Sequence, residues 1–126
     1  INHNNQKDFI NSYLIRLNIN ILYSEFLYEL LIYINTYKIG NLNSRLSTKV
    51  ASIIYLLILS ENIDISIDTI SSEFDISIST FKTYYNNIYK KRELLYKLFD
   101  KYKISMPEKL VRKNSSVKKK ITKKLV

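Results

Sequence analysis

The chain has 126 residues, 46% of them hydrophobic, and carries a formal net charge of +9 at pH 7. This length favours one domain, large enough to bury a core without disulfides or a metal. Cysteine is absent and His3 is the only histidine, which excludes zinc ribbons and thiol nucleophiles from these residues. The single glycine, Gly40, excludes a glycine-rich phosphate loop and argues against nucleotide enzymes.

The positive charge is unevenly distributed along the chain. Residues 1–78 hold five Lys or Arg against eight Asp or Glu, residues 79–111 hold eight against three, and residues 112–126 hold seven bases and no acid. A positive surface that faces phosphate would produce this asymmetry, and so would a solvated lysine-rich surface. The charge alone does not decide between them.

Scarce glycine and proline, together with long segments of helical period, favour an all-α domain in spite of the many Ile and Tyr residues. The first predicted helix covers residues 7–17 and the second residues 21–37, with Gly40 near the C-terminal cap of the second. Apolar side chains recur on one face of each helix: Phe9, Ile10, Tyr13, Leu14 and Leu17 in the first, and Leu22, Phe26, Leu27, Leu30, Leu31 and Ile34 in the second.

Residues 50–59 form a nearly continuous apolar run. A helix needs roughly 20 apolar residues to cross a bilayer, so this run predicts a buried helix and no membrane partner. Ser47 or Thr48 is expected to cap that helix, which should end near Ser60 and lie at the centre of the fold because it is apolar on every side.

Residues 66–89 have the proportions of a helix-turn-helix. Ser66 is expected to cap a short helix that ends at Phe74, Asp75 to form the turn, and Ser77 to cap the next helix.

The second helix of this unit is amphipathic. Its period turns Phe81, Tyr84, Tyr85 and Ile88 toward the core and leaves Ser79, Lys82, Thr83, Asn86 and Lys90 outside. A polar, donor-rich outer face is typical of a helix that reads a DNA groove, although any amphipathic helix has a polar face. The tyrosines are expected to pack in the core rather than to stack on single-stranded bases. The apolar period continues through Leu94, Leu95, Leu98 and Phe99 and fails before Pro107.

Three groups of residues, in order, resemble the second cyclin-like repeat of the transcription factor IIB family. Asp8 and Phe9 match the start of the family's first helix, and Ala51, Ser52, Ile54 and Tyr55 match its third. The recognition-helix motif is matched by Thr80, Phe81, Lys82, Tyr85, Ile88 and Tyr89. The resemblance implies a five-helix cyclin-like bundle over residues 8–111, after a linker at residues 1–7 and before a basic tail at residues 112–126.

The resemblance also implies a function. The family's repeat binds double-stranded promoter DNA in the major groove beside a TATA-binding protein and helps to position RNA polymerase. Lys82 matches the position of the base-reading arginine, Ser79 that of an apolar base contact, and Asp75 that of the glycine in the turn. The expected DNA-binding residues are Ser79, Thr80, Lys82, Thr83, Asn86, Lys90, Lys91 and Arg92. No cofactor is expected, and the domain is expected to act as a monomer.

Further lysines follow the recognition helix, and we hypothesise that several of them contact phosphates: Lys97, Lys101 and Lys103. The basic tail resembles a nuclear-localisation or phosphate-binding patch. The AT-rich codon bias is compatible with a large DNA virus or with a cellular AT-rich genome, and hence with a nucleus or a cytoplasmic viral factory.

Other functions were weighed against this one. The same fold would serve a cyclin-like adaptor that binds a protein instead of DNA. A free-standing helix-turn-helix regulator would need a dimer and spaced half-sites. An enzyme is not expected, because the acidic residues Asp64, Asp68, Glu73 and Asp75 have no His, Cys or glycine-rich partner and are typical of helix-end charges.

Overall fold

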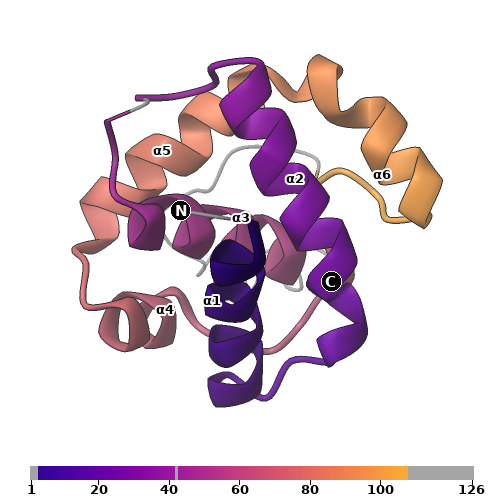
Figure 1. The fold of residues 1–126 in the computed structure, drawn as a ribbon. Helices are drawn as coiled ribbons and strands as arrows, with labels where there is room; N and C mark the ends of the chain where they lie inside the picture. Colours follow the sequence, from indigo (N-terminus) through magenta and orange to yellow (C-terminus); the bar gives the residue numbers. More distant parts are fainter. Residues whose placement is uncertain (1–2, 42, 108–126) are drawn as a thin grey trace, which may run out of the picture.

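The computed structural model describes residues 3–41 and 43–107, and all regular secondary structure in these ranges is helical. The elements are α1 (His3–Arg16), η1 (Ile21–Tyr23), α2 (Ser24–Thr36), α3 (Leu46–Glu61), α4 (Ile67–Phe74), α5 (Ile78–Lys90), η2 (Arg92–Leu95) and α6 (Tyr96–Tyr102), where η denotes a 3-10 helix (Figure 1). The prediction of an all-α fold is confirmed for the described residues. They form six α-helices, whereas five were expected.

Helix α3 is the centre of the core, as its apolar run predicted. All residues from 50 to 58 are buried, and α3 packs against α2, α4 and α5 (Figure 1). The one polar side chain among them, Ser52, places its hydroxyl 2.8 Å from the Thr48 carbonyl oxygen and 3.1 Å from that of Phe81. Its single proton therefore always has an acceptor, and the second acceptor ties α3 to α5.

Several predicted boundaries need correction. Helix α1 begins at His3, so residues 3–7, expected as a linker, are helical. Helix α3 begins at Leu46, which places Ser47 and Thr48 inside its first turn instead of at the cap; Arg45 precedes the helix in an extended conformation and makes no side-chain cap bond. The second predicted helix starts as a 3-10 turn, because the Asn20 side chain accepts the Leu22 N–H at 2.9 Å.

The apolar period that runs on from α5 is interrupted. Helix α5 ends at Lys90, and the 3-10 turn η2 redirects the chain before α6. Leu95, Leu98 and Phe99 are buried, whereas Leu94, expected in the same stripe, is 42% exposed. A 3-10 turn advances fewer residues per turn than an α-helix, so the spacing that served α5 no longer points Leu94 inward.

Gly40 does not cap α2. The helix ends at Thr36, and Lys38 takes the left-handed conformation with φ +52°. Gly40 has φ +76°, and a Cβ there would lie 2.9 Å from two ring carbons of Tyr84, a distance that side chains do not tolerate. The Tyr84 hydroxyl donates a hydrogen bond to the Ile39 carbonyl oxygen at 3.1 Å, and burial raises the pKa of this hydroxyl to about 12. The chain after α2 is thereby held against α5.

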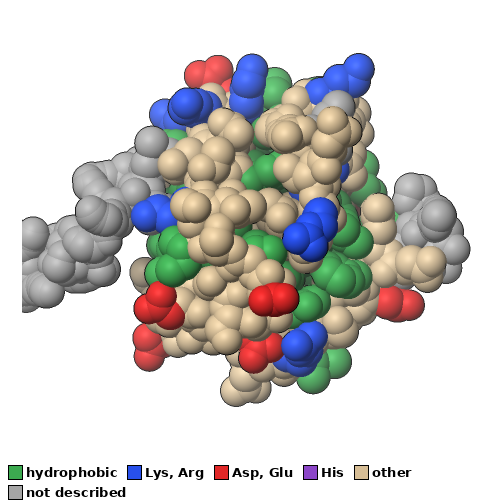
Figure 2. Space-filling model, turned by 90° about the vertical axis from the view of Figure 1, so that its left-hand side faces the viewer, with side chains coloured by type: hydrophobic (Ala, Val, Ile, Leu, Met, Phe, Trp, Pro, Cys, Tyr) green, Lys and Arg blue, Asp and Glu red, His purple; other side chains and the backbone are tan. Residues whose placement is uncertain are grey.

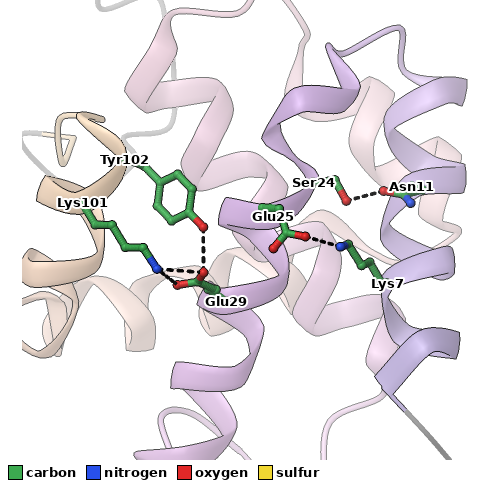
Figure 3. Close-up of polar contacts among 7 residues, drawn as sticks. All are labelled: Lys7, Asn11, Ser24, Glu25, Glu29, Lys101 and Tyr102. Carbon is green, nitrogen blue, oxygen red and sulfur yellow. Dashed lines mark hydrogen bonds and ion pairs between the residues drawn. The ribbon is translucent and has the colours of Figure 1, made fainter.

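Polar contacts attach α1 and α6 to opposite sides of α2 (Figure 3). Lys7 pairs with Glu25, and the Ser24 hydroxyl donates to the Asn11 side-chain oxygen. On the other side, the Lys101 ammonium lies 3.0 Å from both Glu29 carboxylate oxygens, and the Tyr102 hydroxyl donates to one of them at 2.7 Å. The Tyr102 hydrogen bond, aided by Lys101, lowers the pKa of Glu29 below its ordinary value of 4.5.

Candidate nucleic-acid interface

Helices α4 and α5 are joined by three residues. Two serine caps and one residue in the left-handed conformation set the geometry of this connection. The Ser66 hydroxyl accepts the Thr69 N–H at 3.1 Å, and the Ser77 hydroxyl accepts the Thr80 N–H at 3.2 Å. Asp75 ends α4 in the left-handed conformation, with φ +56° and its N–H bonded to the last carbonyls of that helix. All three positions were predicted from sequence. A non-glycine residue is uncommon in this conformation, and Asp is among those that tolerate it.

The two faces of α5 are as predicted. Phe81, Tyr84, Tyr85 and Ile88 are buried, as is Tyr89. On the outside, Ser79, Thr80, Thr83 and Lys90 are exposed, and Lys82 and Asn86 are partly exposed. Lys82 takes part in no hydrogen bond or ion pair with any described residue. The outer face is therefore polar and carries an unneutralised ammonium group.

The first turn of α5 engages some of its own hydroxyls. Thr80 Oγ1 lies 2.7 Å from Ser77 Oγ, and Ser79 Oγ lies 3.4 Å from the same atom. These groups stabilise the helix start, so Ser79 and Thr80 present hydroxyls that are already partly occupied. The freer candidates for contact with a ligand lie one turn further along, at Lys82 and Thr83.

Asn86 and Tyr85 each bury a polar atom without a partner. Asn86 Oδ1 and the Tyr85 hydroxyl oxygen have no hydrogen bond among the described residues. Burial, with the neighbouring Tyr55 and Tyr89, raises the pKa of Tyr85. An asparagine that reads adenine uses both its oxygen and its nitrogen, so Asn86 must rotate before it can make that bidentate contact.

Basic residues follow α5 directly. Lys90 and Lys91 are exposed and unpaired among the described residues. Arg92 folds back on the helix end: its guanidinium lies 4.3 Å from the centre of the Tyr89 ring and donates to the Tyr89 carbonyl oxygen at 2.9 Å. A cation at this end also complements the helix dipole. Arg92 thus has a structural role that the sequence did not indicate.

The two helices of this unit differ in charge: α4 and its flanks are acidic, and α5 is basic. Residues 61–75 contain five acids and no base, whereas residues 76–92 contain four bases and no acid. Figure 2 shows this face of the molecule, with most Lys and Arg side chains in the half where Figure 1 places α5 and most acids in the half where it places α4. A polyanion would be attracted to α5 and repelled from α4.

One of the hypothesised phosphate contacts already has an acidic partner. Lys101 forms an ion pair with Glu29 of α2, although its side chain stays 59% exposed (Figure 3). Lys97 and Lys103 are exposed and have no ion-pair partner among the described residues. The basic tail at residues 112–126 lies outside the described residues.

Other kinds of site were sought in residues 3–41 and 43–107. No group of three or more His, Cys, Asp or Glu side chains there is placed to hold a metal ion. None of the described helices has the length and apolarity that crossing a membrane requires. Comparison with protein-family models, curated proteins and solved structures found no match.

Proposed function

We propose that this chain is a DNA-binding cyclin-like repeat of a transcription initiation factor similar to transcription factor IIB. In this role it binds double-stranded promoter DNA beside a TATA-binding protein and positions RNA polymerase, as a monomer and without a cofactor. The observation that carries the proposal is the outer face of α5, which is polar, free of acids and followed by two exposed lysines. It has the composition of a helix that enters a major groove.

The residues divide into two groups by their role. Lys82 and Thr83, with Ser79, Thr80 and Asn86 around them, form the face that meets base edges. Lys90, Lys91 and Arg92 lie at the end of the helix and contact phosphates, which fixes the position of the helix in the groove. Lysine offers one ammonium in place of the rigid fork of arginine, so the preference for guanine at this position is weaker than an arginine would give.

The packing between α3 and α5 supports the resemblance to the cyclin-like repeat. The motif residues meet in the core: the Tyr55 ring lies edge-on to Phe81 at 5.7 Å and to Tyr85 at 5.4 Å, and the Ser52 hydroxyl reaches the Phe81 carbonyl. Small residues at positions 51 and 52 allow the two helices to approach closely. Four of the matched residues, Ser52, Tyr55, Phe81 and Tyr85, therefore form one contact, and the opposite face of α5 is turned outward.

A protein-binding adaptor is the second candidate. Leu22 is 82% exposed, and it borders a cavity of about 350 Å³ that is also lined by Phe26, Tyr102 and Ile104. This arrangement would accept an apolar side chain from a protein partner. In that role, a change at Lys82 would leave binding of the partner intact.

The test begins with duplexes enriched by the full chain from a random pool. The chain and its Lys82→Gln variant are then titrated on an enriched and an unrelated duplex, with and without a TATA-binding protein. Loss of a base contact is expected to weaken binding to the enriched duplex about tenfold and to affect the unrelated one much less.

Lys7→Gln is the matched control, because it removes one positive charge from α1. It should leave both affinities unchanged. If no duplex is enriched, or if both variants behave like the wild-type chain, the DNA-binding proposal is wrong and the adaptor role is favoured.

A further inference from the structure

A second stretch of the chain is free of acids. Residues 30–60 contain Lys38, Arg45 and Lys49 and no Asp or Glu, just as residues 76–92 contain only bases. The two stretches are separated in sequence by the acidic residues 61–75. How close these two basic stretches lie in space depends on the fold.

The fold brings the chain next to Lys38 into contact with α5. The Tyr84 hydroxyl bonds to the Ile39 carbonyl at 3.1 Å, and the Tyr84 ring packs over Gly40 in space that a Cβ would fill. Lys38 is the residue before this contact. Arg45 directly precedes α3, the helix that makes the most extensive packing with α5. Lys38 therefore lies beside α5, and Arg45 lies next to the start of the helix that packs most extensively against α5.

These two side chains are available to a ligand. Lys38 and Arg45 are exposed, and neither forms an ion pair or a side-chain hydrogen bond with a described residue. Lys49 differs, because it is partly buried and donates to the Asn35 side-chain oxygen at 3.0 Å, and burial lowers its pKa. Lys38 and Arg45 thus present two positive charges that are unpaired among the described residues, whereas Lys49 is held against α2.

The acids on α4 and its flanks give an independent reason to expect phosphate contacts elsewhere. In helix-turn-helix proteins the first helix crosses the DNA backbone, but here α4 and its flanks carry Asp64, Asp68, Glu73 and Asp75. Phosphates are repelled from that side, and only Glu73 is paired, with Arg16 at 3.3 Å. A duplex over α5 therefore has to make its backbone contacts with residues outside α4 and its flanks.

We propose that Lys38 and Arg45 form a second DNA-contacting element, which binds phosphates of the duplex beside α5, where Tyr84 holds the chain that follows α2. This proposal rests on the proposed function, because it assumes that α5 meets duplex DNA. Tyr84 and Gly40 position the element.

The first test is the salt dependence of duplex binding by the full chain and its Lys38→Asn/Arg45→Gln variant. Asn is chosen at position 38 because it tolerates the left-handed conformation found there, φ +52°. Loss of two phosphate contacts should reduce the slope of log K against log salt by about 1.8. The control, Lys7→Gln, removes one charge from α1 and should leave the slope unchanged.

A second test does not depend on affinity. The chain has no cysteine, so a single Cys introduced at Lys38, at Arg45 or at Ser72 of α4 can be labelled uniquely with a photoactivated crosslinker. Ser72 is exposed and close to Cys in size, which makes it the matched control. We expect crosslinks to the duplex from positions 38 and 45 and none from position 72.

The outcomes separate the two proposals. A wild-type chain that binds no duplex overturns both. Duplex binding that depends on Lys82, with an unchanged slope in the Lys38/Arg45 variant or with crosslinks from position 72 instead of 38 and 45, overturns the second element alone. An equal fall in slope in the α1 control also overturns it.

Discussion

One contact between individual residues, which only the structure shows, fixes the geometry of the chain after α2. The sequence contains a single glycine, Gly40, and the prediction that it lies near a helix cap was wrong. Gly40 is required because the Tyr84 ring occupies the space of a Cβ. A contact between residues 44 positions apart leaves no local pattern, so the period of either helix could not have indicated it.

Gly40→Ala is predicted to destabilise the protein by about 1–3 kcal/mol, since it adds a methyl group to filled space at a positive φ of 76°. The measurement is urea unfolding of the variant beside the wild-type chain. In the double variant Gly40→Ala/Tyr84→Leu the steric part of this cost should be smaller, as a double-mutant cycle would show. Equal stability of Gly40→Ala and wild type would contradict the assigned contact.

At the scale of elements, the sequence predicted best where the determining interactions are local. Ser66 and Ser77 cap their helices as expected, and the buried face of α5 follows its apolar period. The prediction failed where tertiary packing decided: Ser47 or Thr48 was expected as a cap, yet α3 begins at Leu46, directly after Arg45. The redirection at η2 was also missed, because an apolar period does not report a change from α to 3-10 geometry.

The caps allow a test of the α5 start. Ser77→Ala should cost about 1 kcal/mol of stability, because the Thr80 N–H loses its side-chain acceptor. Ser79→Ala is the matched control: it lies in the same turn, is exposed and accepts no backbone N–H among the described hydrogen bonds, so it should change stability far less. Thermal unfolding of both variants measures the difference, and equal losses would contradict the cap assignment.

At the scale of the whole molecule, charge is sorted by the fold. Acids are concentrated on α4 and its flanks, and bases lie on α5, after it and at Lys38 and Arg45. The sequence already showed the division between the two ends of the chain. It could not show that the chain at Lys38 lies beside α5 or that Lys101 pairs with Glu29, since both contacts are made between distant segments.

The Glu29 contacts give the whole fold an acid-sensitive link between α2 and α6. Because the folded-state pKa of Glu29 is lowered, its stabilisation is present above its ordinary pKa of 4.5 and is lost as pH falls through the folded value. Glu29→Gln should be less stable at neutral pH and should lose less stability on acidification. Urea unfolding from neutral pH to about pH 3 measures this, with the exposed Glu93→Gln as control. Parallel curves for Glu29→Gln and wild type would contradict the link.

The central claim is that the basic end of α5 rests on the phosphates of a DNA duplex. The most direct measurement is the salt dependence of duplex affinity for the full chain and for Lys90→Gln/Lys91→Gln, in which all other bases are kept. The account predicts that the slope of log K against log salt falls by about 1.8 in the variant, because two phosphate contacts are lost. An unchanged slope would contradict it, since the binding would then arise from charges elsewhere on the chain.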